Sequence, residues 1–224
     1  MISRKTSNTA DSIEREITEL KEGLNELDIA FEQSTLDRFK VYLEVLYHYH
    51  GKIHLLSHRD YERIALRHFL PSLLILPDVM RHKRVCDIGS GAGFPSVPLK
   101  ILVPHLDLVI FEAQRKKANF LKTLVQTLEL KKTKIVNARA ETYSGVKFDL
   151  ALLRAVGKIR RLIAVLNQLI EPGSEAIFLK AVQVEKELAQ AKKALHQWNY
   201  QVSVRKVSTP VEKSSLSMVI LRKM

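Results

Sequence analysis

The sequence contains a single cysteine, Cys86, among its 224 residues. One thiol can form no disulfide within the chain and cannot build a zinc site that needs several thiolates. Because Cys86 lies inside an apolar run, we expect it to be a small buried hydrophobic residue.

Long apolar runs are missing as well, since even residues 73–76 form a run far too short to cross a bilayer. The first residues, MISRKTSNTADS, are polar and lack the apolar core of a signal peptide. These absences predict a cytoplasmic protein with no membrane contact, and we expect it to be a monomer.

Acidic side chains are the scarcer charge, because 24 Asp and Glu face 36 Lys and Arg, which gives a net charge of +12. Residues 11–32 carry a net charge of −6, so the rest of the chain is strongly basic. A basic body attracts polyanions such as RNA, since each neutralised phosphate releases a condensed counterion. The composition is equally consistent with a basic protein that binds no polyanion and whose lysines are only solvated.

The first third of the sequence has the apolar spacing of helices. Apolar residues recur every three or four positions in residues 11–30 and again in residues 36–46. Residues 61–76 continue the helical pattern, with an expected break at Pro71. We assign residues 1–79 to an N-terminal helical extension.

Residues 80–224 form the second predicted domain, in which short apolar runs alternate with helical stretches. The runs VCDI, LDLVIF, KIV, FDLALL and AIFLK are the expected strands. This alternation is typical of an α/β fold with βαβ units around a mostly parallel sheet. The last runs, YQVSVRKV and LSMVILRK, have no helical stretch between them, so they predict an antiparallel hairpin at the sheet edge.

Glycine is scarce, yet Gly89, Gly91 and Gly93 fall within five positions directly after the first predicted strand. In parallel sheets, ligands bind beyond the carboxyl ends of the strands. Phe94 occupies the position of the third glycine in the dinucleotide fingerprint, and the loop is a poor P-loop too. Asp87 would repel phosphate but suits a ligand with a sulfonium and an amino group. The loop therefore predicts S-adenosylmethionine as the cofactor.

A second carboxylate, Glu112, ends the next predicted strand nineteen residues after Gly93. At that interval an acidic side chain reaches the ribose hydroxyls of a nucleotide in such folds. Glu112 could instead cap the helix that starts near Gln114. Because Asp87 and the glycines are in register, the ribose role is favoured.

The ends of the third and fourth predicted strands complete the expected site. Ala140 and Glu141 follow the third strand and could read the adenine edge, although an exposed turn with an incidental acid fits as well. Arg154 ends the fourth strand, nearest the expected methyl group. No Asn/Asp-Pro-Pro-aromatic motif follows there, and the cysteine nucleophile of pyrimidine C5 methylation is missing at this strand end. A ring nitrogen with a lone pair, such as guanine N7, can attack the methyl group without first losing a proton. Catalysis then consists chiefly of aligning the nitrogen with the methyl group and of electrostatic stabilisation.

From about residue 52 to residue 180 the sequence resembles the bacterial RsmG family, also called GidB or glucose-inhibited division protein B. The resemblance lies in RHFLPSL, DIGSGAGFPSVPL, FEAQRKKANFL, ARAE, FDLALLRAV and FLK. It implies a Rossmann-like class I S-adenosylmethionine-dependent methyltransferase with an N-terminal helical extension. It also implies methylation of N7 of one guanine in the 16S ribosomal RNA of the small subunit, free or in a ribosomal particle.

The predicted site follows from the loop, the strand ends and this resemblance. Cofactor contacts are expected from Asp87, Gly89, Ser90, Gly91, Gly93, Phe94, Glu112, Ala140, Glu141 and Arg154, and Arg154 is the catalytic candidate. RNA contacts are expected from Arg67, His68, Arg115, Lys116, Lys117 and Lys180, although a solvated helix face explains residues 115–117 about as well. The histidines within residues 48–58 lack a matching carboxylate or thiol set, so we expect no metal there.

The sequence departs from the family pattern at four places, because the family usually has Asp at Pro71, Gly at Ser96, Gly at Ala181 and Asn-Leu-Thr at His54-Leu55-Leu56. We interpret these departures as gathered on the substrate side, where they would affect the guanine target more than the cofactor. A methyltransferase with another acceptor and a catalytically silent RNA-binding or ribosome-assembly module therefore remain alternatives.

Overall fold

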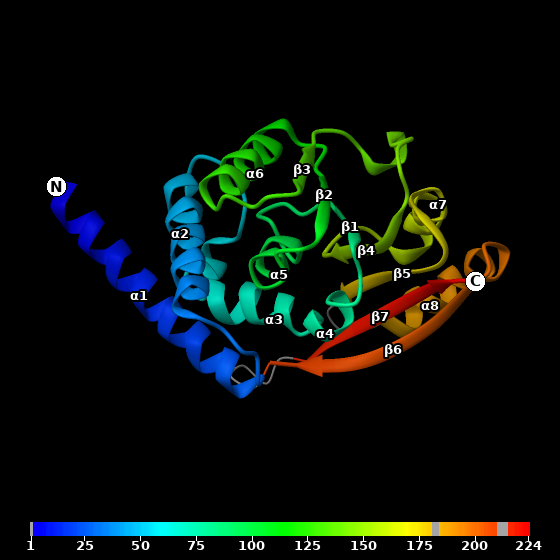
Figure 1. Ribbon diagram of the computed structural model, residues 1–224, viewed down its shortest axis with the longest axis horizontal. Helices are drawn as coiled ribbons and strands as arrows, with labels where there is room; N and C mark the ends of the chain where they lie inside the picture. Colours follow the sequence, from blue (N-terminus) through cyan, green and yellow to red (C-terminus); the bar gives the residue numbers. More distant parts are fainter. Residues whose placement is uncertain (1, 181–183, 210–214) are drawn as a thin grey trace.

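The computed structural model describes residues 2–180, 184–209 and 215–224. The chain begins with two helices, α1 (Ile2–Glu26) and α2 (Gln33–Tyr49), as the apolar spacing predicts. In Figure 1 they lie on one side of the molecule, and the later helices α7 (Ile159–Leu169) and α8 (Val184–Gln197) lie on the other.

Short helical turns lead from α2 to the sheet. They are η1 (His58–Asp60), the π-helical turn η2 (Ala65–Phe69), α3 (Leu70–Leu73) and α4 (Leu76–Val79). The predicted break at Pro71 is wrong, because η2 runs directly into α3 and Pro71 lies in the first turn of α3. The helical segment continues past Pro71 although proline has no N–H to donate to the carbonyl four residues earlier.

In the described part of the chain, seven strands form one sheet in the order β3-β2-β1-β4-β5-β7-β6. Their bounds are β1 Arg84–Ile88, β2 Asp107–Phe111, β3 Thr133–Val136, β4 Phe148–Arg154, β5 Ile170–Lys180, β6 Tyr200–Ser208 and β7 Ser215–Lys223. The first five strands pair in parallel, whereas β7 runs antiparallel to both β5 and β6. The predicted α/β class and the antiparallel edge hairpin are confirmed.

Helices cover both faces of this sheet. Side chains alternate between faces along each strand, so Val85 belongs to the core of one face and Cys86 to the core of the other. The first face packs against α5 (Ser96–Leu102) and α6 (Arg115–Thr127), and the second against α7 and α8. Cys86 is fully buried, as expected.

The N-terminal helices share the core of the first face. Leu20 of α1 and Phe39 of α2 belong to the same apolar cluster as Leu99 of α5 and Phe120 of α6. The extension therefore packs against the helices that cover the first face of the sheet. The division of the chain at residues 79 and 80 stays a prediction.

The helices of the described residues include none that is long and apolar enough to cross a membrane.

Candidate functional site: a glycine loop over a parallel sheet

The three glycines after β1 take backbone conformations that L side chains rarely adopt, with φ values of +72°, +59° and +105° at Gly89, Gly91 and Gly93. A Cβ on Gly93 would come within 3.0 Å of the Tyr42 hydroxyl, and one on Gly89 would lie 2.9 Å from Val156. A Cβ on Gly91 would meet nothing within 4 Å. Two glycines are therefore required by close packing, whereas Gly91 presents bare backbone to open space.

Tyr42 of α2 holds this loop from beneath. Its hydroxyl donates to the carbonyl of Ala92 at 2.7 Å, and its ring stacks on Phe94 with centroids 5.8 Å apart. The side chain is fully buried. The helical extension thus fixes the position of the loop.

Asp87 lies beneath the same loop and is fully buried. Its Oδ2 accepts hydrogen bonds from the Ser96 hydroxyl at 2.5 Å and from the Ser96 N–H at 3.4 Å. Burial raises the pKa of Asp87 to about 7. Its Oδ1 is a buried atom without a hydrogen-bond partner among the described residues. Asp87 therefore supports the loop through Ser96.

This geometry corrects the interpretation of the family departures. Ser96 is buried against Asp87, beneath the loop, so the expectation that it lies on the substrate side is wrong. Pro71 is also buried. Ala181 lies outside the described residues.

Glu112 links the loop to the end of β2. Its Oε2 accepts the N–H of Gly91 at 3.2 Å, and its Oε1 accepts the N–H of Gln114 at 2.8 Å. The Asn137 side-chain amide donates to the Glu112 carbonyl at 2.9 Å, which ties in the end of β3. The contact with Gln114 is the one expected of a helix-capping acid, and the contact with Gly91 places the same carboxylate beside the bare loop backbone.

Ala140 and Glu141 lie in η3 (Ala140–Thr142), beyond the end of β3. Ala140 is buried and Glu141 is exposed. Both residues follow β3, which pairs with β2, the strand that ends just before Glu112. The sequence predicts this placement after the third strand.

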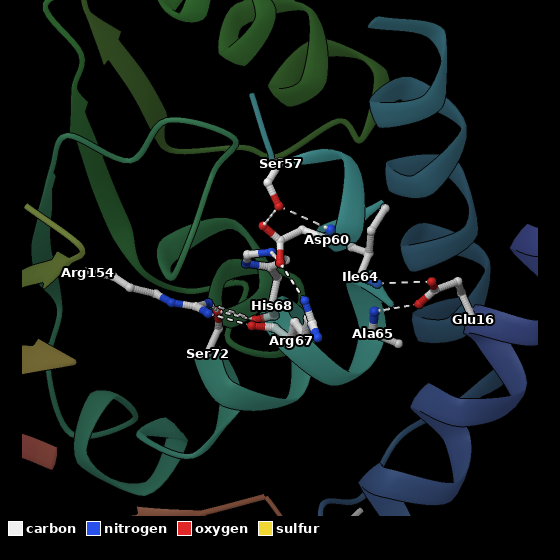
Figure 2. Close-up of polar contacts among 9 residues, drawn as sticks. All are labelled: Glu16, Ser57, Asp60, Ile64, Ala65, Arg67, His68, Ser72 and Arg154. Carbon is white, nitrogen blue, oxygen red and sulfur yellow. Dashed lines mark hydrogen bonds and ion pairs between the residues drawn. The ribbon is translucent and has the colours of Figure 1, made fainter. Parts of the chain in front are cut away.

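Arg154 at the end of β4 reaches across to the extension, as Figure 2 shows. Its Nη1 donates to the His68 carbonyl at 3.0 Å and to the Ser72 hydroxyl at 3.1 Å, and its Nη2 donates to the Arg67 carbonyl at 2.6 Å. Pro71 has no N–H that could donate a hydrogen bond to the Arg67 carbonyl four residues earlier. Arg154 donates the hydrogen bond to this carbonyl instead.

The Arg154 guanidinium also lies over the Phe94 ring, 5.7 Å from its centroid. Burial lowers the pKa of Arg154 to about 10, which leaves the group cationic at neutral pH. Three of its five N–H donors bind the extension, so two face elsewhere.

His68 packs beside Arg154. Its ring stacks on Phe94 at 4.8 Å, and burial, followed by the charge of Arg154, lowers the pKa of His68 to about 3. The imidazole is therefore neutral at physiological pH, and its Nε2 is buried without a hydrogen-bond partner in the described part of the chain.

These groups surround one cavity of about 380 Å³. Its lining residues are His54, Leu55, Leu56, Ser57, Asp60, His68, Gly89, Ser90, Gly91, Ala92, Phe94, Lys117, Arg154 and Ala155. The structure thus brings together predicted cofactor residues of the loop and β4 with two predicted RNA residues, His68 and Lys117. Asp87, Gly93, Glu112, Ala140 and Glu141 lie outside this lining.

The other predicted RNA residues have different surroundings. Arg115 and Lys116 are exposed at the start of α6, while Arg67 forms an ion pair with Asp60 at 3.3 Å. Lys180 binds the Gly157 carbonyl at 2.6 Å and pairs with Glu187 at 3.0 Å, so only 13% of its side chain is exposed. The RNA role of each stays a prediction.

Sequence reasoning missed Tyr42 and Asp60. Tyr42 lies in an ordinary helical stripe, and its partner Ala92 is fifty residues away, so no local signal marks it. Asp60 is one acid in the polar segment after α2, and its position on the cavity wall follows from the fold. In residues 2–180, 184–209 and 215–224, no group of three His, Cys, Asp or Glu could hold a metal ion.

Comparison with protein families assigns the chain. Residues 35–215 match the family model GidB, rRNA small subunit methyltransferase G. The chain belongs to this family. The Bacillus subtilis (strain 168) protein named ribosomal RNA small subunit methyltransferase G is 31% identical over 215 residues, which cover 92% of this chain and 90% of that protein. The Halalkalibacterium halodurans protein of the same name is 34% identical over 216 residues, with 93% and 91% covered.

Solved structures show that this member of the GidB family has the class I methyltransferase fold. NSun6 from Pyrococcus horikoshii with SFG superposes with a TM-score of 0.56 at 14% identity, over 69% of this chain and 52% of that chain. TYW2 from Pyrococcus horikoshii in complex with MeSAdo superposes with a TM-score of 0.54 at 14% identity, over 68% and 60%. The predicted family and fold are confirmed.

Proposed function

We propose that this chain is an S-adenosylmethionine-dependent methyltransferase of small-subunit ribosomal RNA that methylates N7 of a guanine. The observation that carries the proposal is the bare backbone of Gly91 beside the Glu112 carboxylate, at the carboxyl ends of adjacent parallel strands. Membership of the GidB family supports ribosomal RNA as the acceptor. A cytoplasmic location and a monomeric state remain predictions.

The residues present fit S-adenosylmethionine. The loop backbone faces open space at Gly91, where a Cβ would meet nothing within 4 Å. Glu112 would hold the ribose hydroxyls, since a hydrogen bond to an ionised carboxylate is worth about 1.5 to 3 kcal/mol. Ala140 and Glu141 stand on the side where the adenine is expected, and Asp87 holds the loop through Ser96. When bound, the cofactor supplies an electrophilic methyl group on sulfur.

The protein's share of the chemistry is alignment. Guanine N7 has a free lone pair, so its attack on the methyl carbon requires no general base. Phe94, His68 and Arg154 pack against one another in the cavity wall, and the two Arg154 N–H groups not used by the extension would orient the base. The reaction needs no proton transfer. This agrees with a cavity whose histidine, His68, is neutral and has a pKa of about 3, so that it is a weak base.

Transfer of a radiolabelled methyl group tests this function. The protein is incubated with labelled S-adenosylmethionine and either 16S ribosomal RNA or small subunits from a strain that lacks the enzyme. We expect label in the RNA, and none with Gly91→Asp, which places a carboxylate in the cofactor's space. Label in ribosomal protein or in a small molecule would instead identify another acceptor. RNA binding without any transfer would identify a silent assembly module.

A further inference from the structure

Asp60 lines the same cavity as the glycine loop. It belongs to η1, in the helical extension, whereas Gly89, Ser90 and Gly91 belong to the loop after β1. The cofactor proposed above is held on the loop side. The space beside Asp60 is therefore left for the base that receives the methyl group.

The Asp60 carboxylate is held in place by its neighbours, as Figure 2 shows. Its Oδ2 accepts the Ser57 hydroxyl at 2.5 Å, and its Oδ1 accepts Arg67 Nη1 at 3.3 Å. Burial works against ionisation, but the hydrogen bonds from Ser57 and Arg67 and the charge of Arg67 lower the pKa of Asp60 below its ordinary value. About 25% of the side chain is exposed, so the anion is fixed yet accessible.

A donor stands beside this acceptor. His68 Nε2 lies 3.7 Å from Asp60 Oδ1, is buried, and has no hydrogen-bond partner among the described residues. A neutral imidazole carries one N–H, and in the tautomer with the proton on Nε2 it donates. The Asp60 carboxylate oxygens are therefore acceptors that lie next to one buried donor, His68 Nε2.

This order matches one base. The Watson–Crick edge of guanine offers two donors, N1–H and N2–H, next to one acceptor, O6. Adenine offers N1 as an acceptor at the central position and has no amine at C2. A carboxylate opposite adenine N1 would face a lone pair, and a buried polar group left unpaired destabilises the complex.

We propose that Asp60 selects guanine as the methyl acceptor by accepting hydrogen bonds from N1–H and N2–H, with His68 Nε2 opposite O6. Recognition of an unstacked base along its Watson–Crick edge leaves N7, which lies beyond O6 on the Hoogsteen edge, free of these hydrogen bonds. This inference rests on the proposed methylation of guanine. It adds a residue that reads the base to those that hold the cofactor.

Inosine provides the test, because it lacks only the C2 amine of guanosine and keeps N7 and O6. The target guanosine of 16S ribosomal RNA is replaced by inosine through ligation of a synthetic segment. The ratio of kcat/KM for guanosine and inosine substrates is then measured for the native protein, Asp60→Asn and Asp60→Ala. Asp107→Asn serves as the control, since Asp107 is exposed at the opposite end of the sheet.

We expect the native protein and the control to favour guanosine about tenfold or more, which corresponds to about 1.4 kcal/mol. Asp60→Ala should bring the ratio close to one, and Asp60→Asn should lower it at least about threefold. Any unfolded fraction cancels in the ratio because both substrates meet the same preparation. A native ratio near one, or an unchanged ratio in both variants, overturns the inference. Failure of the native protein to methylate guanosine-containing RNA would instead overturn the proposed function.

Discussion

Alanine at Gly91 and alanine at Gly93 should damage different properties of this protein. Gly91 has a φ of +59° and open space where a Cβ would lie. Gly93 has a φ of +105°, and its Cβ would come within 3.0 Å of the buried Tyr42 hydroxyl and 3.0 Å from Val97. The first change should therefore block the ligand, whereas the second should destabilise the fold.

The expected magnitudes follow from these surroundings. Gly91→Ala adds only left-handed backbone strain, which costs about 1 kcal/mol of unfolding free energy. It also puts a methyl group into the space assigned to the cofactor, so we expect the affinity for S-adenosylmethionine to fall at least about tenfold. Gly93→Ala combines backbone strain of about 1 to 3 kcal/mol with overpacking of similar size, so about 4 kcal/mol should be lost.

A second substitution, at Tyr42, tests the predicted overlap between a Cβ at position 93 and the Tyr42 hydroxyl. Tyr42→Phe alone removes the hydrogen bond to the Ala92 carbonyl and should cost about 1 kcal/mol. In combination with Gly93→Ala it removes the overlapping hydroxyl, so the double variant should lose less stability than the two single losses added together.

Urea unfolding measures the stability of each variant, and calorimetric titration measures the affinity for S-adenosylmethionine. Binding of the cofactor by Gly91→Ala with native affinity would contradict the open space assigned to the ligand at Gly91. Equal losses of stability in both alanine variants would also contradict the reasoning, because the two glycines would then have equivalent surroundings.

Three further predictions concern Arg154, Asp87 and the RNA. Arg154→Ala leaves the Arg67 and His68 carbonyls without their donor and should lower the unfolding free energy by about 3 kcal/mol in urea; native-like stability would contradict the bridging role. Burial raises the pKa of Asp87 from 3.8 to about 7, so the folded state holds this proton more tightly than the unfolded chain. The stability that Asp87 contributes is therefore complete below about pH 4 and is lost by a few kcal/mol as the pH rises through 7. The difference in unfolding free energy between the native protein and Asp87→Asn should fall over that interval, and a difference that is constant with pH would count against the buried carboxylate. Finally, kcat/KM for ribosomal RNA should decrease steeply with salt while the affinity for S-adenosylmethionine hardly changes, because phosphate contacts release counterions; equal salt responses would argue against RNA as the substrate.

The strands and the glycine loop could be predicted from sequence because their signals are local. Alternating apolar runs predicted the five strands of the mostly parallel sheet, and the missing helix between the last two runs predicted the edge hairpin. The position of Glu112 beside the loop could also be predicted, since adjacent parallel strands end at the same edge of a sheet, while its ribose contact stays a prediction.

The remaining features depend on contacts between distant segments. Proline was expected to break the helix at Pro71, but Arg154 from β4 satisfies the Arg67 carbonyl that Pro71 leaves without a donor. Tyr42 and Asp60 come close to the loop through packing of the extension, which periodicity does not specify. Ser96 looked like a change on the substrate side because its partner Asp87, nine residues earlier, is seen only in the folded chain.

The product nucleoside tests the central claim most directly. After the protein has acted on 16S ribosomal RNA with S-adenosylmethionine, the RNA is digested to nucleosides and the methylated product is identified by mass spectrometry against standards. The account predicts 7-methylguanosine as the new nucleoside, formed by the native protein and not by Gly91→Asp. Methylation at N1 or N2 of guanosine, or on any other nucleoside, would contradict it.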